Sequence, residues 1–299
     1  GSDSTNEAPK PLPEPPPVIE KTPSVARQWN KMLLTGIRND YARPTVHARN
    51  LFHVSSAMYD AWTAFTQDSS SYLLGKTMSG SECTFDDINL SDDTPQGIQN
   101  AREEAISFAA YKLISTRFIF SPDNADTFAK ADALMSELGY DITNISTDYS
   151  SGSAAALGNH IADCYLAFGA VDGSKEDILH GNAFYQVSNL PLDPSLPGNP
   201  NITDMDRWQS LDLGTYIDQS GNVVTGAIEF LGAEWGEVAP FSMTDADKTT
   251  FERDGNTYTV YHDPGMPPTH TGDLAEEYEW NFSLVSKWSS HPDPNDGVM

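Results

Sequence analysis

The sequence predicts a mainly α-helical chain, a helical bundle with long loops and one or two small β-hairpins. Apolar residues recur at three- and four-residue steps through most of residues 24–168, which is the period of an amphipathic helix. The periodicity fades after Gly169 and returns near the end of the sequence. We therefore expect one helical domain over 24–299, with a helix-rich part at 24–168, a loop-rich part at 169–272 and a last helix at 273–290.

The first 23 residues have a different composition. Prolines stand at positions 9, 11, 13, 15, 16, 17 and 23, which fixes φ repeatedly and removes backbone donors. We expect a disordered tether here, suited to a lipid anchor or signal sequence upstream. A periplasmic or extracellular location, with tethering to a membrane, fits this arrangement.

Two helices are expected directly after the tether, over 24–39 and 45–65, with Arg43-Pro44 breaking the chain between them. The apolar stripe of the second consists of Leu51, Val54, Met58, Ala61, Trp62 and Phe65.

A polar line follows the other side of that second helix. Its members stand at i, i+4, i+7 and i+11, and they are Arg49, His53, Ser56 and Asp60. The line either faces solvent or surrounds a buried polar site. We favour the interpretation that these side chains are solvated or form hydrogen bonds between helices over the interpretation that they are catalytic.

Three further helices have clear boundaries. Thr94-Pro95 is a cap followed by proline at the first helical position, and the helix runs to about Phe118. Ser121-Pro122 repeats this pattern before a helix that Gly139 ends. The Ala-rich segment 151–168 predicts a closely packed, central helix.

The loop-rich part contains two turn signals between β-prone runs, Ser220-Gly221 and Asp254-Gly255, which predict small hairpins. A long irregular segment of this kind tends to be functional or to wrap a neighbouring domain. One helix follows at about 273–288, through Leu274, Tyr278, Phe282 and Val285.

The charge excludes most nucleic-acid functions. The 299 residues carry 17 Lys and Arg against 43 Asp and Glu, a formal net charge of −26, whereas a phosphate-binding surface needs clustered cations. We expect no nucleic-acid partner.

The two cysteines, Cys83 and Cys164, allow one disulfide or none. The favoured interpretation of Cys164 is a small buried apolar residue, and a Cys83–Cys164 bridge is the alternative.

Local signals for metals and catalysis are weak. None of the seven histidines lies in a zinc-binding pattern, and nucleotide and serine-hydrolase motifs are absent from the sequence. His160 and Asp163 share a helix face and either hold a metal or, as favoured, fix the helix to a neighbour. Glu234 and Glu237 beside Trp235 are a minor candidate for a glycosidase-like pair, because the indole could raise a carboxyl pKa by desolvation.

Several segments in order resemble one family. They are Trp29-Asn-Lys-Met-Leu-Leu, Arg43-Pro-Thr-Val-His-Ala-Arg-Asn-Leu, Val54-Ser-Ser-Ala-Met-Tyr-Asp-Ala-Trp, Gly158 through Asp172-Gly173, Asp206-Arg-Trp-Gln, Gly232-Ala-Glu-Trp-Gly-Glu-Val-Ala-Pro-Phe, Tyr261-His-Asp-Pro-Gly-Met-Pro-Pro and Trp288 to Met299. Through these segments the sequence is similar to the vanadium-dependent haloperoxidase-like proteins of the phosphatidic-acid-phosphatase type 2 superfamily over about residues 24–299.

The resemblance implies a mostly helical bundle whose active site binds vanadate or phosphate. In the haloperoxidases a histidine ligates vanadate, cations neutralise its oxygens, and bound peroxide oxidises halide. The family's Lys-x6-Arg-Pro, Pro-Ser-Gly-His and Ser-Arg-x3-Gly-x-His segments have no counterpart here, and Gly36 stands seven positions before the single Arg-Pro at Arg43. We therefore assign no catalytic, cofactor-binding or metal-binding residue.

The resemblance thus implies the N-terminal helical part of a secreted haloperoxidase-like or acid-phosphatase-like protein, with vanadate bound only in the complete protein. The expected partner is a C-terminal catalytic half of the same protein, with a homo-oligomer as a further option, and an apolar patch should lie exposed beside the last helix. The alternative is a non-catalytic helical lipoprotein or binding module. Residues proposed to line the entrance to the site are Trp235, Phe241, His262 and His270.

Overall fold

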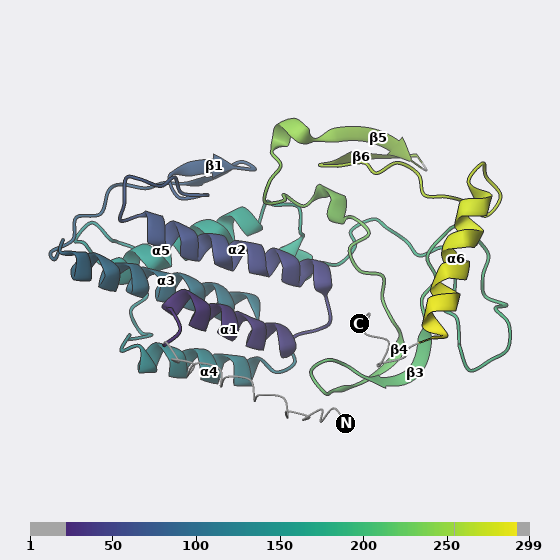
Figure 1. Ribbon diagram of the computed structural model, residues 1–299, viewed down its shortest axis with the longest axis horizontal. Coiled ribbons are helices and arrows are strands. Elements are labelled where there is room, and N and C mark those ends of the chain that lie inside the picture. The colour runs from purple at the N-terminus through teal and green to yellow at the C-terminus, as the bar shows by residue number, and fades with distance from the viewer. Residues whose placement is uncertain (1–21, 254, 292–299) are drawn as a thin grey trace, which may run out of the picture.

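The computed structural model describes residues 22–253 and 255–291, which leaves most of the expected tether and the last eight residues outside the described part. The described chain is mainly α-helical, with six α-helices and three two-stranded antiparallel sheets (Figure 1). The helices are α1 Val25–Arg38, α2 Pro44–Thr63, α3 Pro95–Arg117, α4 Asn124–Glu137, α5 Ala154–Gly169 and α6 Ala275–Ser289. The strands are β1 Lys76–Met78, β2 Ser81–Cys83, β3 Asp212–Ile217, β4 Val223–Ala227, β5 Thr249–Arg253 and β6 Asn256–Val260.

The helices begin close to the predicted positions because their caps are local. Hydroxyl oxygens of Ser24, Thr94 and Ser153 accept hydrogen bonds from backbone amides three residues ahead, at the starts of α1, α3 and α5. The predicted start of α4 at Ser121-Pro122 is wrong, since α4 begins at Asn124. Ser121 instead donates its hydroxyl to Asp40 over 2.9 Å, which removes it from the cap position.

The core lies between α1, α2, α3 and α5 (Figure 1). Helix α5 is closely packed as predicted, but the central helix is α3, which contacts α1, α2, α4 and α5. Small residues let α3 and α5 approach closely. A Cβ at Gly158 of α5 would lie 2.5 Å from the carbonyl oxygen of Ala105 and 2.8 Å from Cβ of Phe108. Glycine at this position therefore sets the separation of the two helices.

The predicted apolar stripe of α2 is only partly right. Val54, Met58 and Ala61 are buried, but Leu51 is 37% exposed and Trp62 is 40% exposed. The polar line Arg49, His53, Ser56 and Asp60 is buried instead. The reason is that α2 lies with this line against α3, α5 and the segment after α5, where carboxylates and backbone groups supply partners.

Both predicted hairpins are confirmed, as β3–β4 and β5–β6, but a third was not predicted. Strands β1 and β2 pair through a two-residue turn at Ser79-Gly80, where both residues have positive φ, 49° and 79°. Such turns fit the right-handed twist of a hairpin.

This third hairpin corrects the interpretation of the cysteines. Cys83 at the end of β2 lies against α5 and forms a disulfide with Cys164, which joins residues 81 apart in sequence. The favoured interpretation of Cys164 as a free buried thiol is therefore wrong.

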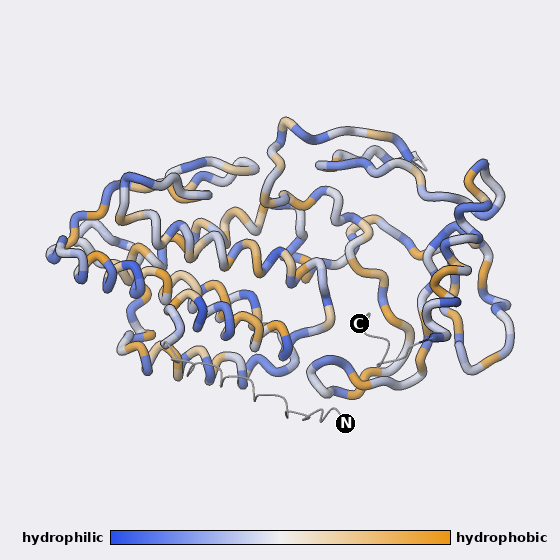
Figure 2. The backbone as a smooth tube through the Cα atoms, viewed as in Figure 1, coloured by the Kyte–Doolittle hydropathy of each residue, from blue (hydrophilic) through white to orange (hydrophobic). Residues whose placement is uncertain are grey.

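The last helix has few contacts with the rest of the molecule. Helix α6 stands at the far end from α1–α5 (Figure 1), and none of its described residues is buried. Its large apolar side chains include Trp280, Phe282, Val285 and Trp288, which are 62% to 71% exposed. Figure 2 shows hydrophobic positions interspersed with hydrophilic ones along this helix. Within the described chain, α6 is not long and apolar enough to cross a membrane, and neither is any other helix.

Candidate functional site

Buried or partly buried ionisable side chains gather where α2 and α3 meet the segment that follows α5. We name this group the arginine cluster, and it consists of Arg49, His53, Arg117, Asp172 and Glu176. Helix α2 supplies the first two, α3 ends with Arg117, and the chain after α5 supplies both carboxylates.

Arg49 occupies the centre of the cluster. Its Nε donates to Oδ2 of Asp172 over 2.5 Å and its Nη1 donates to Oε1 of Glu176 over 2.8 Å. Burial opposes the charged guanidinium, but the two carboxylates outweigh this effect, and the pKa of Arg49 is raised. A planar fork with several donors suits this position better than a lysine would.

Arg117 is buried beside Arg49 and binds a histidine. Its Nη2 lies 2.7 Å from Nδ1 of His53, and its Nε lies 3.3 Å from Oε1 of Glu176. Burial and the neighbouring Arg49 lower the pKa of Arg117 to about 10, although the two carboxylates act in the opposite direction.

The contact with Arg117 determines the tautomer of His53. A guanidinium only donates, so Nδ1 of His53 accepts and the ring proton is on Nε2. Nε2 lies 3.5 Å from Oδ2 of Asp172 and makes no hydrogen bond within the described chain. Burial, followed by Arg117 and Arg49, lowers the pKa of His53 well below its usual value, so the imidazole is neutral near pH 7.

Both arginines also bind the end of α5. Arg49 Nη2 donates to the carbonyl oxygen of Gly169 over 3.1 Å, and Arg117 Nη2 to that of Tyr165 over 3.3 Å. Cations at the C-terminus of a helix satisfy free carbonyls and complement its dipole. The cluster therefore joins α2, α3 and α5 at one point.

The segment next to the cluster has an unusual backbone. Lys175, Leu179 and His180 all have φ between 56° and 65°, a region that residues other than glycine rarely adopt. Lys175 Nζ contacts Oε2 of Glu234 at 2.8 Å and Oε2 of Glu237 at 3.2 Å. These ion pairs fasten the strained segment to the turn that carries Glu234 and Glu237.

Glu234 has a structural role that argues against a glycosidase-like pair. Its carboxylate accepts backbone N–H groups of Ala183, Phe184 and Tyr185 over 2.8 to 3.0 Å. Burial opposes its charge, but the Lys175 contact and these amides prevail and lower its pKa to about 2. The expected rise in pKa beside Trp235 is wrong, because backbone donors surround the carboxylate.

A cleft of about 480 Å³ opens on the other side of Glu234 and Glu237. It lies between the 184–188 segment and the hairpin β5–β6. Its walls combine aromatic rings with charged side chains, among them Phe184, Tyr258, Arg253 and His262. The ring of Tyr258 stacks on Phe251 and lies 5.6 Å from that of Phe184, so much of the aromatic surface is already paired within the wall.

Asp60, the last member of the polar line, accepts hydrogen bonds from backbone amides and from one hydroxyl group. Oδ1 accepts the amide of Tyr72, and Oδ2 accepts the amides of Leu73 and Leu74 and the hydroxyl of Tyr165. The carboxylate holds the 72–74 loop against α2 and α5. It binds the interior of the protein, in agreement with the favoured prediction of hydrogen bonding between elements.

The four predicted entrance residues lie in different surroundings. His262 lines the cleft, and Trp235 packs near His180 with ring centroids 6.0 Å apart. Phe241 stacks on Tyr72 at 5.2 Å, and His270 Nδ1 lies 3.0 Å from Oδ2 of Asp206. Their role at an entrance stays a prediction.

His160 and Asp163 do not act together. Asp163 forms an ion pair with Lys112 of α3 at 2.6 Å, which fixes α5 to its neighbour as favoured. His160 faces the other way and contacts the carbonyl oxygen of Thr84 at 2.6 Å.

Comparison with known proteins leaves the family open. No protein-family model matches the sequence, and a search of curated proteins found no match either.

The sequence pointed to two of the five residues of the arginine cluster. Arg49 and His53 stood out as members of a polar line, but Arg117, Asp172 and Glu176 were missed. Their contacts with α2 join residues 64 to 127 apart in sequence, and no local pattern reports such a pairing.

The cluster is charge-balanced. Two guanidinium groups face two carboxylates and His53 is neutral, so a bound oxyanion would leave excess negative charge in a buried place. The arrangement is suited to holding helices and the strained segment in position.

Proposed function

We propose that this chain is the N-terminal helical part of a periplasmic or extracellular vanadate-dependent haloperoxidase-like or acid-phosphatase-like protein. A C-terminal half of the same protein would supply the oxyanion-binding residues. The helices α1 to α5 would form the bundle that supports this half, and the loop-rich segment would surround the entrance to its site.

The observation that carries the proposal is the exposure of α6. A helix that folds in water usually buries an apolar stripe, yet Trp280, Phe282, Val285 and Trp288 are all exposed. The contacts that hold it include a hydrogen bond from Tyr278 Oη to the carbonyl oxygen of Met205 at 2.9 Å. An apolar surface of this kind is typical of an interface, and the proposed C-terminal half would cover it.

The use of the basic residues supports the same proposal. Arg49, Arg117 and Lys175 each contact carboxylates. A vanadate or phosphate pocket needs several fixed donors that are not neutralised by acids. Such donors are expected in the other half of the protein.

The disulfide fits the proposed location. Disulfides persist in oxidising surroundings and are rare in the cytosol, and Cys83–Cys164 links two buried residues. A lipid anchor before the N-terminal segment would add tethering to a membrane.

The alternative function is a non-catalytic helical binding module. The observation in its favour is the arginine cluster itself, which uses the ionisable residues of α2 and α3 for structure.

An activity assay distinguishes the two. The 299-residue chain is mixed with orthovanadate, peroxide and bromide, and bromination of a phenol dye is followed, with a chromogenic phosphate ester in parallel. We expect no activity from this chain and activity from a version extended past Met299. Activity of the 299-residue chain would overturn the proposal that its donors lie elsewhere, and inactivity of both versions would favour the binding module.

A further inference from the structure

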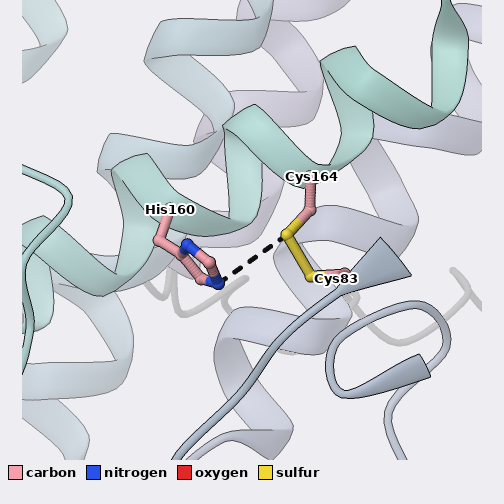
Figure 3. Close-up of side chains that lie close together, drawn as sticks. All are labelled: Cys83, His160 and Cys164. Atoms are coloured by element: carbon pink, nitrogen blue, oxygen red, sulfur yellow. Dashed lines mark hydrogen bonds between the residues drawn. A yellow bond between two sulfur atoms is a disulfide. The ribbon is translucent and has the colours of Figure 1, made fainter. Parts of the chain in front are cut away.

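Three residues of types that bind metals meet where the hairpin β1–β2 lies on α5 (Figure 3). Cys83 ends β2, and His160 and Cys164 stand one turn apart on α5. Their ligand atoms, the two Sγ and Nε2, all lie within 4.8 Å of one another. This group is remote from the arginine cluster and independent of the proposed function.

We propose that the reduced chain binds a thiophilic divalent cation, with Zn²⁺ as the preferred ion, through Cys83 Sγ, Cys164 Sγ and His160 Nε2. In the described state the two sulfurs are joined, so the site exists only after reduction. A dithiol or phosphine reductant supplies two electrons, the S–S bond breaks, and two thiols form. Binding of the cation then releases both thiol protons to solvent.

The distances fit a tetrahedral ion. With Zn–S near 2.3 Å and Zn–N near 2.05 Å, a sulfur and a nitrogen ligand lie about 3.6 Å apart, and two sulfurs about 3.8 Å apart. Cys164 Sγ and His160 Nε2 are already 3.7 Å apart. The sulfur pair has to separate, and Cys83 Sγ, which lies within 4.8 Å of Nε2, has to reach the ligand distance from it. Breaking the covalent bond allows both movements.

The imidazole needs a change of tautomer and a small movement relative to Thr84. His160 Nε2 now donates to the carbonyl oxygen of Thr84 at 2.6 Å, so its proton must move to Nδ1 and the freed lone pair must turn from this oxygen toward the cation. The ring is held close to its position by Tyr149, whose centroid is 5.2 Å away. His160 is half-buried, so a water molecule can complete the coordination.

The cation would take over the mechanical role of the disulfide. The disulfide between Cys83 and Cys164 is a covalent link that fixes the short hairpin β1–β2 to α5. A Cys–metal–Cys link between the same two residues would keep the hairpin in place under reducing conditions. The chain would thus exchange one cross-link for another according to the redox state.

Cobalt titration tests the proposal. The full chain is reduced with a phosphine under anaerobic conditions and titrated with Co²⁺, which gives thiolate charge-transfer absorption and intense visible bands when tetrahedral. We expect these bands at one Co²⁺ per chain and their loss on addition of Zn²⁺. The oxidised chain should show neither. Absence of thiolate charge transfer in the reduced chain would overturn the proposal.

A matched pair of variants separates the site from unspecific binding. His160→Ala should weaken Zn²⁺ binding at least tenfold, and His262→Ala, at an exposed histidine, should leave it unchanged. Equal affinities of the two variants would contradict the assignment of His160. If reduction unfolds the chain, circular dichroism measures its helix content before and after Zn²⁺ is added. We expect Zn²⁺ to restore the helices. A failure to restore them would also overturn the proposal.

Discussion

Arg117 donates a hydrogen bond to Nδ1 of His53 over 2.7 Å and so joins α3 to α2 through a buried, neutral imidazole. The same guanidinium lies next to Arg49, and the two cations are held together by Glu176 and Asp172. This cluster adds buried ion pairs to the apolar packing that joins the same helices. Its members therefore dominate the expected effects of mutation and pH.

His53 should make stability depend on pH near neutrality. Its pKa is lowered on folding, so the unfolded chain binds more protons as the pH falls below 6.5, and stability is lost there. As the pH falls, the free energy of unfolding should decrease more steeply in the native chain than in His53→Gln. We expect the two slopes to differ by up to about 1.4 kcal/mol per pH unit. Urea unfolding between pH 8 and pH 5 measures this difference, with His262→Gln as the control that keeps the native slope.

Arg49 should be intolerant of substitution. Arg49→Met leaves the buried carboxylate of Asp172 without its ion-pair partner, at a cost of about 3 to 5 kcal/mol, while Glu176 keeps its contact with Arg117. Arg49→Lys retains the charge but loses the fork, so we expect an intermediate loss. Chemical denaturation gives both values. The exposed Arg27→Lys should change stability by less than about 0.5 kcal/mol, and an equally small effect at Arg49 would refute the role of the cluster.

Gly158 should be required for the contact between α3 and α5. Gly158→Ala places a methyl group 2.5 Å from the carbonyl oxygen of Ala105, and the backbone there can yield only by separating the helices. We expect a loss of about 1 to 3 kcal/mol despite the better helix propensity of alanine. Thr116→Ala, on the exposed side of α3, serves as the control and should be neutral or stabilising. A stabilised Gly158→Ala would show that the helices are not in this close contact.

Glu234 should contribute stability that disappears only in strong acid. Its pKa falls from the ordinary 4.5 to about 2 on folding, so the contribution is complete above pH 4.5 and is lost as the pH falls through about 2. Glu234→Gln should cost about 1.5 to 3 kcal/mol at pH 7, since the amide cannot pair with Lys175 or accept all three backbone donors. The difference from the native chain should vanish by about pH 2. Glu229→Gln, at an exposed carboxylate, is the control, and a Glu234 variant that behaves like it would contradict the structural role.

The helices could be predicted because their signals are local. Ser24, Thr94 and Ser153 cap their helices within three residues, and apolar periodicity spans each element. The hairpin at Ser79-Gly80 carried a usable turn signal, but its strands have only three residues each. A period is hard to recognise over so short a run.

The site could not be predicted to the same extent. The polar line on α2 was visible, but its burial depends on Asp172, which is 123 residues from Arg49. Lys175 and His180 adopt positive φ although neither is glycine. Lysine and histidine rarely have this conformation, so their residue types do not predict it. Long-range ion pairs and a strained segment arise only when the whole fold is assembled.

We propose that this chain supports an oxyanion site without containing it. Vanadium NMR of orthovanadate in the presence of the 299-residue chain is the measurement that bears on this proposal. With the 299-residue chain we expect the free-vanadate signal to keep its width and intensity. With the version extended past Met299 we expect the signal to decrease in proportion to the protein added, to one vanadate per chain. Saturable binding of one vanadate to the 299-residue chain, abolished by Arg117→Gln, would contradict the account.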